Sequence, residues 1–223
     1  MYSRDFSDLP EKIIIDGKPQ FGTYKTAPQK LDIKYVKEPF NCFPVPSFFT
    51  NLRIRANITY VLNIDNFVGV VDFFDSKYFC FIEVVLWDKE TKKKYAYRTV
   101  FGFKRLVPKN LEKATCGNFR KKRYIKISWD KSKEKFTLVF NAKGDDARPN
   151  FAATFKRNGE LFGEFCTINP SPTKRRCTAS YCQAFPIEAT LTKTPTKHQN
   201  FKSTNYKNSG LSFFDLRRSY YKL

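Results

Sequence analysis

Apolar and polar side chains alternate along many short segments of this chain, with the period of two that is typical of half-buried β-strands. The longest example is LRIRANITYVLNI, residues 52–64. Its first positions place Ile54 and Ala56 on one face and Arg53 and Arg55 on the other. The pattern predicts a long strand with one face in a core and the other toward water.

A further pair of strands is predicted from residues 67–73 and 78–86, which flank the polar tip Asp75-Ser76-Lys77. Both segments carry apolar side chains on both faces, as strands do when they are covered from two sides. We therefore expect them to form a barrel wall with something packed outside it.

The segment NFRKKRYIKISWDKSKEKFTLVF, residues 118–140, contains eight cationic and two acidic side chains. It could be a nucleic-acid-binding surface or the wet side of a hairpin. Apolar residues alternate with polar ones on both sides of the turn at 130–135. They are Ile125, Ile127, Trp129, Phe136, Leu138 and Phe140. A period of two places the three apolar residues before the turn and the three after it on one face, and it turns Lys126 toward water. The segment is therefore primarily an amphipathic hairpin, and any binding surface would be an addition to it.

Two dipeptides give local turn signals. Asp16-Gly17 follows three isoleucines, and Asn158-Gly159 separates two apolar runs within 151–165. Both pairs favour the positive φ angles of tight hairpin turns, and the second is the strongest such signal in the chain. No segment shows a sustained helical period. The sequence therefore predicts an all-β fold with few or no helices, either an antiparallel β-barrel or a strongly curved β-sheet.

The predicted organisation has three parts. Residues 1–189 are expected to form the β-barrel domain, and residues 190–210 a polar linker of net charge +4. Residues 211–223 form an apolar and basic terminal segment, which could begin a second β-layer.

Charge is distributed unevenly along the chain. Residues 1–90 hold 11 Lys/Arg and 12 Asp/Glu, whereas residues 91–223 hold 30 and 9, so nearly all of the net charge of +20 lies in the second part. This asymmetry indicates either a surface for an anionic partner or lysines that keep exposed strand edges from pairing. Because the cations are dispersed through predicted strands, the second interpretation is favoured.

The remaining composition favours a cytoplasmic protein without metal or cofactor. No secretory signal is visible at the N-terminus, and acidic and basic residues interrupt the most apolar segment, so no simple membrane span is expected. No phosphate-binding glycine motif is present. The single histidine, His198, lies in the predicted linker, and no two cysteines have zinc-ligand spacing. The six cysteines are therefore expected to be reduced core residues: Cys42, Cys80, Cys116, Cys166, Cys177 and Cys182.

Candidate catalytic groups are few. His198 is expected to be a solvated side chain rather than a general base. Asp72 and Glu83 lie in the most apolar hairpin and could act as an acid–base pair. With the tip near Ser76, however, Asp72 would lie opposite a residue near Phe79, so we expect the two carboxylates to be apart. The sequence assigns no catalytic residue.

Two kinds of binding site remain. A closed or curved sheet can hold an apolar ligand among aromatic side chains, although the same rings could simply fill the core. The candidate pocket residues are Phe101, Phe103, Trp129, Phe136, Leu138 and Phe140. The candidate anion-binding residues are Arg120, Lys121, Lys122 and Arg123. Three tyrosines, Tyr95, Tyr97 and Tyr124, lie beside cations and could stack nucleic-acid bases.

Three phrases together resemble a family known as domain of unknown function 2804. They are GKPQFGTY (17–24), NIDNFVGVVDFFDSKYFCFIEVVLWDKETKKKYAY (63–97) and FFDLRRSYY (213–221). The resemblance implies a lipocalin-like, β-rich fold related to proteins that handle lipid-like molecules, and it implies no catalytic or binding residue. The family continues beyond the motif matched by Asp215, Arg217 and Arg218, and Leu216 stands where it has an aromatic residue. The chain could therefore be a C-terminally truncated member.

These observations lead to a β-barrel that binds a small apolar or lipid-like ligand. The alternative is a basic module that binds RNA or acidic lipid. A third hypothesis is a hydratase or hydrolase that uses Asp72 or Glu83. The sequence predicts no oligomeric state.

Overall fold

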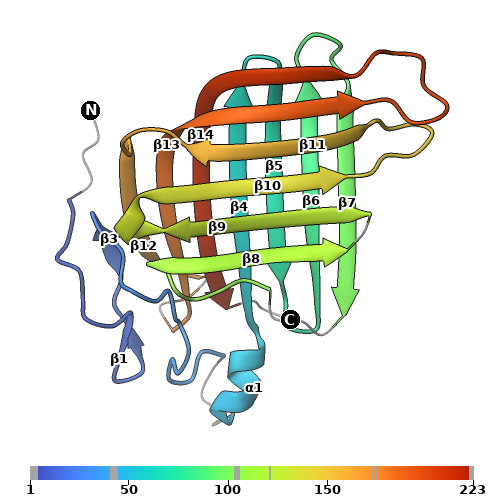
Figure 1. Cartoon of the computed structure of the whole chain (residues 1–223). Helices are drawn as coiled ribbons and strands as arrows, with labels where there is room; N and C mark the ends of the chain where they lie inside the picture. Colours follow the sequence, from blue (N-terminus) through green and yellow to red (C-terminus); the bar gives the residue numbers. More distant parts are fainter. Residues whose placement is uncertain are drawn as a thin grey trace.

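The fold is a strongly curled antiparallel half-barrel, seen in the computed structural model of Figure 1. The structure describes residues 5–40, 45–102, 106–120, 122–171, 173 and 175–220. Within them, ten strands follow one another through the sheet in the order β7-β6-β5-β4-β14-β13-β11-β10-β9-β8. The prediction of an all-β, strongly curved sheet with almost no helix is therefore confirmed.

Two layers of the sheet cross one another in Figure 1. The front layer contains β8 (Lys113–Arg120), β9 (Arg123–Asp130), β10 (Lys135–Ala142) and β11 (Asn150–Arg157). The back layer contains β4 (Ile54–Ile64), β5 (Phe67–Asp75), β6 (Phe79–Asp88) and β7 (Lys94–Gly102). Two long strands, β13 (Cys177–Thr194) and β14 (Thr204–Tyr220), bend from one layer into the other. The sheet thus folds over itself around a shared core.

A glycine sits where β14 begins to pair with the back layer. Gly210 is opposite Ile64 in β4 and opposite Ile187 in β13. A Cβ atom on Gly210 would lie 2.3 Å from the carbonyl oxygen of Asn63. Only glycine allows this close approach of two backbones, which brings β4 against the corner of the long strands.

The Asn158-Gly159 pair does not form the predicted hairpin. β11 and β12 (Gly163–Pro170) both pair with β13 and not with each other. The connection runs along β13, with hydrogen bonds from Asn158 N to the carbonyl of Pro186 and from Phe162 N to that of Ala184. Gly159 does take the expected positive φ, of 115°. The dipeptide therefore supplies a bend between two successive partners of β13.

The amphipathic hairpin of residues 118–140 is confirmed. β9 pairs with β10 so that Ile125 faces Phe140, Ile127 faces Leu138 and Trp129 faces Phe136. All six side chains are buried. Lys126 lies on the opposite face, as the alternation requires.

Smaller elements surround one end of the half-barrel. They are β1 (Ile14–Ile15), β2 (Lys18–Pro19), β3 (Gly22–Tyr24), α1 (Ser47–Leu52) and the 3-10 turn η1 (Lys131–Lys133). The predicted turn at Asp16-Gly17 joins β1 to β2, with φ angles of 50° and 77°. In the described part of the chain, no helix is long and apolar enough to cross a membrane.

The predicted linker of residues 190–210 lies mostly within the sheet. Its first residues complete β13, and its last residues begin β14, which pairs with β13 from Thr204 onward. Residues 195–203 connect the two strands. The polar composition of this segment reflects the exposed ends of paired strands rather than a free connection. The terminal segment, as far as Tyr220, continues β14 between β13 and β4.

Candidate functional site

One end of the half-barrel contains an open-mouthed cavity of about 350 Å³, which we call the end cavity. It lies where β5 and β14 end and β4 begins, between the two layers. The lining residues are Asp32, Lys34, Ile54, Ala56, Asp75, Lys77, Leu106, Val107, Pro108, Lys109, Thr115 and Arg218. Its volume falls within the range of small-molecule sites, and its walls combine aliphatic and charged side chains.

One register row explains why this space exists. Ala56 in β4 is directly opposite Arg218 of β14 on one side and Asp75 of β5 on the other. All three are buried on the inner face of the sheet. Because alanine has only a methyl group, the row leaves room between two charged side chains where a larger residue would fill the interior.

Arg218 and Asp75 together fix residues 106–108. The Asp75 carboxylate accepts hydrogen bonds from the backbone N–H of Leu106 at 2.8 Å and of Val107 at 3.4 Å. Arg218 Nη2 donates to the carbonyl oxygens of Val107 at 2.9 Å and of Pro108 at 3.0 Å. This short segment is thus held from both sides along its backbone, and it forms one wall of the end cavity.

Arg218 keeps one donor unused among the residues that the structure describes. Arg218 is only 6% exposed, and its buried Nε has no hydrogen-bond partner among the described residues. An unpaired buried donor costs about 1–3 kcal/mol, and this one is fully covered by protein, as are Tyr60 Oη, Thr99 Oγ1 and Arg176 Nε elsewhere in the described residues. Arg218 is the buried cation among the described lining residues, so its guanidinium is the strongest recognition element in the end cavity.

The charge of Arg218 is balanced only in part. Burial lowers the pKa of Arg218, whereas the negative charges of Asp32 and Asp75 raise it. Asp32 already pairs with Lys109. The described lining residues include four cations and two carboxylates. An arginine stays protonated under these conditions, so the end cavity favours an anionic group.

The described residues of the predicted aromatic pocket pack in the core of the half-barrel. Phe136 stacks on Tyr60 with ring centroids 5.6 Å apart, and Trp129 contacts Phe214 at 5.4 Å. Phe101, Leu138 and Phe140 are also buried. None of these five lines the end cavity. Phe103 lies outside the described residues. Their role in binding stays a prediction, and the contacts show how they hold the two layers together.

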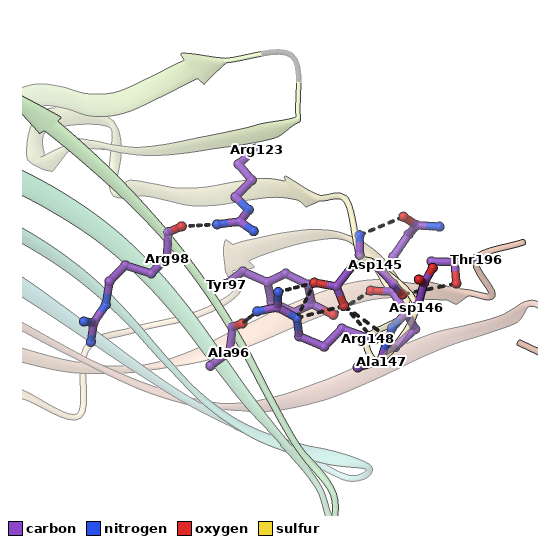
Figure 2. A network of polar contacts seen from close by, with 12 residues as sticks. Ala96, Tyr97, Arg98, Arg123, Asp145, Asp146, Ala147, Arg148 and Thr196 are labelled. Carbon is purple, nitrogen blue, oxygen red and sulfur yellow. Dashed lines mark hydrogen bonds and ion pairs between the residues drawn. The ribbon is translucent and has the colours of Figure 1, made fainter. Parts of the chain in front are cut away.

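Three of the four predicted anion-binding residues line a different cleft. Arg120, Lys122 and Arg123 lie with Lys143 beside the edge strand β7, whereas Lys121 is outside the described residues. Figure 2 shows Arg123 donating to the carbonyl oxygen of Arg98 in that strand. Their clustering ahead of the strand that begins the hairpin identified these cations in the sequence, but it did not show what they face.

Asp72 and Glu83 are direct cross-strand neighbours, contrary to the prediction that they are apart. The hairpin tip is centred later than Ser76, because Lys77 takes a left-handed φ of 71° and Asp75 pairs with Cys80. The two carboxylates lie on the outer face of β5 and β6, and neither lines the end cavity.

The other candidate groups of the sequence are placed as follows. His198 Nε2 lies 3.5 Å from a carboxylate oxygen of Asp146, and both side chains are exposed. The five described cysteines are buried, whereas Cys42 is outside the described residues. No group of three His, Cys, Asp or Glu side chains in the described ranges could hold a metal ion.

Arg218 was missed as a site residue, although the sequence carried a signal. It shares the inner face of β14 with Phe214, Leu216 and Tyr220, so one charged residue interrupts an apolar alternation. A buried arginine in such a pattern needs hydrogen-bond partners. Those partners come from residues 106–108, which only the folded chain brings close.

The chain was compared with known proteins. No family model matches it, so the resemblance to domain of unknown function 2804 stays a prediction. No curated protein matches it either. Among solved structures, it is similar to kievitone hydratase from Nectria haematococca over 73% of this chain and 88% of that chain, with 9% identity and a TM-score of 0.27. The likeness concerns the curled β-sheet, and a TM-score this low carries no argument about function.

Proposed function

We propose that this chain binds a small, lipid-like molecule that has an apolar body and one acidic group. The end cavity would hold the molecule, with its acidic group on Arg218 and its body against Ile54, Leu106 and Val107. The observation that supports this most directly is the buried guanidinium of Arg218 in a lining whose described residues include four cations and two carboxylates. A carboxylate or sulfonate oxygen would accept from this guanidinium in a charge-assisted hydrogen bond.

The apolar part of the proposal rests on the inner face of the sheet. Ile54 and Leu106 are buried, and Ala56 leaves the space between them and Arg218. Burial of aliphatic carbon contributes about 25 cal/mol per Å², so a short alkyl or aryl body adds affinity that a mineral anion lacks. Neither Asp72 nor Glu83 has a role in this binding, and the proposal includes no reaction.

The test is calorimetric titration with octanoate and with octanamide, which has the same chain without the charge. Octanoate is expected to bind at least about tenfold more tightly than octanamide, because only the carboxylate pairs with Arg218. Arg218→Met should remove this preference. Arg217→Met, which removes a charge from the opposite face of the same strand, should leave it unchanged.

A second variant separates loss of binding from loss of folding. Ala56→Leu fills the end cavity and keeps Arg218, so it should weaken octanoate and octanamide alike while the protein stays folded. Equal affinity of the wild type for both compounds would refute the proposal. So would octanoate binding that Ala56→Leu and Arg218→Met leave intact in folded protein.

A further inference from the structure

The second notable cavity lies at a seam where the edge strand β7 meets the ends of the front-layer strands. We call it the seam cleft. It has a volume of about 700 Å³. Its lining residues are Arg98, Thr99, Val100, Arg120, Lys122, Arg123, Lys143, Gly144 and Asp145. The strands that contribute are β7, at one end of the ten-strand order, and β8 and β9, at the other.

Arginine side chains close part of this seam. Arg123 Nη1 donates to the carbonyl oxygen of Arg98, and Arg148 Nη1 donates to that of Ala96. Tyr97 adds a hydrogen bond to the carbonyl of Pro149 at 2.5 Å. The carbonyl groups of Arg98 and Ala96 belong to the edge strand β7, and Figure 2 shows Arg123 and Arg148 reaching them. These contacts fix the walls of the seam cleft.

The two remaining charges near the cleft wall are already neutralised. Arg98 pairs with Glu83 through its Nε and Nη2, both at 3.1 Å. Asp145 accepts hydrogen bonds from Arg148 Nε at 3.2 Å and 3.0 Å, and this arginine holds the pKa of Asp145 below its ordinary value. Neither group therefore offsets the other cations of the lining.

Four cations are left without an acidic partner among the described residues: Arg120, Lys122, Arg123 and Lys143. Arg120 lies over the ring of Phe101, with its guanidinium carbon 4.7 Å from the ring centroid. The backbone N–H of Lys143 donates to the carbonyl of Lys122, so the two lysine side chains leave neighbouring points of the backbone. Like charges held this close repel one another unless an anion lies between them.

We propose that the seam cleft binds a compact, multiply charged phosphate compound, such as a polyphosphate or a polyphosphorylated small molecule. Its several phosphate groups would neutralise the four cations at once, with Arg120 and Arg123 as forked donors to phosphate oxygens. Such a ligand would also bridge β7 and the ends of the front-layer strands. This site is separate from the end cavity and takes a different class of ligand.

The arrangement does not favour single-stranded RNA, which needs exposed rings for its bases. Tyr95 and Tyr97 are buried in the core. Tyr124 packs on Phe119 at 5.4 Å, and both lie on the outer face of β8 and β9, away from the cleft. Within the seam cleft, cations therefore occur without a stacking platform.

The test uses inorganic tripolyphosphate as the probe, with calorimetry at low and at physiological salt. The double variant Arg120→Gln/Lys143→Gln is expected to weaken binding at least about tenfold, because two charge-assisted contacts are lost. The matched double variant Lys126→Gln/Lys156→Gln removes the same charge from the outer face and should change affinity by less than about threefold. Tripolyphosphate should also raise the melting temperature of the wild type, and less so that of the cleft variant.

Three results would overturn the proposal. The first is no detectable binding of tripolyphosphate to the wild type at low salt. The second is equal weakening by both double variants, which would mean that net charge alone attracts the anion. The third is tighter binding of a polyuridine RNA of about 20 nucleotides than of tripolyphosphate, if the cleft variant loses this RNA binding. Circular dichroism of both variants establishes that each is folded before binding is compared.

Discussion

Asp72 and Glu83 face each other across β5 and β6, in a row of polar side chains that crosses the outer face of the back layer. Thr59 donates a 2.7 Å hydrogen bond to Asp72, and Arg98 pairs with Glu83. Asp72 has no cationic partner of its own in these contacts. Burial is the main reason that its pKa is raised, the hydrogen bond from Thr59 opposes the rise, and the charge of Glu83 adds to it.

We predict that Asp72→Asn stabilises the protein by up to about 1 kcal/mol at pH 7. A raised pKa in the folded state means that the ionised carboxylate costs stability above the ordinary pKa of 3.8, and that this cost vanishes below it. The gain should therefore disappear as the pH is lowered toward 3. Urea denaturation from pH 3 to 8 measures it, and a loss of stability at pH 7 would contradict the assignment.

The buried ion pair between Asp88 and Lys193 has the opposite pH dependence. Their atoms lie 2.9 Å apart, with side chains 6% and 12% exposed, and they join the end of β6 to β13. Burial acts to raise the pKa of Asp88, but hydrogen bonds from Thr91 and Lys193 outweigh it and lower that pKa. The stability contributed by this carboxylate is present above the ordinary pKa of aspartate and is lost as the pH falls through its lowered value.

Replacing one partner of this pair should be costly. Lys193→Met is expected to lower the free energy of unfolding by roughly 3 kcal/mol, since it leaves the Asp88 carboxylate buried without its cation. The double variant Asp88→Leu/Lys193→Met should recover part of that loss, because no charge is then left unpaired. A thermodynamic cycle of the three variants at pH 7 measures this. Additive losses would show that the two residues do not interact.

Arg148 protects the edge of β7 by donating to the carbonyl of Ala96. An uncovered strand edge can pair with another chain, and a charged side chain across it prevents this. Arg148→Ala should lower stability by about 1–2 kcal/mol and increase self-association. Sedimentation at several protein concentrations tests this against Arg175→Ala, which removes an exposed arginine whose ion pair is 3.9 Å long. Equal behaviour of the two variants would contradict the role of Arg148.

Gly210 controls how closely β14 approaches β4 at the corner of the sheet. Gly210→Ala is expected to destabilise the fold by about 1–3 kcal/mol, because the new Cβ atom would press on the carbonyl oxygen of Asn63. Gly102→Ala is the matched control, since a Cβ atom there has nothing within 4 Å. Thermal denaturation compares the two. A Gly210 variant as stable as the control would mean that the corner adjusts freely.

The two-residue period predicted the strands and faces that depend on local pattern. Ile125 and Trp129 are buried where the alternation put them, and Lys126 is turned away. Pairings between distant strands were not predictable in this way. Asn158-Gly159 carries a hairpin signal, yet β11 and β12 each pair with the longer strand β13 instead of with each other.

The candidate sites depended still more on distant contacts. The partners of Arg218 come from residues more than 100 positions earlier in the chain, and nothing local indicates them. In contrast, Arg120 and Arg123 were predicted from their clustering in the sequence. What the sequence could not show is that they lie where β8 turns into β9 and that this turn meets the edge strand β7, because that meeting follows from the curvature of the whole half-barrel.

A crystal structure of the protein grown with octanoate tests the central claim most directly. The account predicts density for the ligand in the end cavity, with a carboxylate oxygen about 2.9 Å from a nitrogen of the Arg218 guanidinium and the alkyl chain beside Ile54 and Leu106. An end cavity that holds only water at saturating octanoate, or a ligand bound elsewhere with Arg218 unchanged, would contradict it.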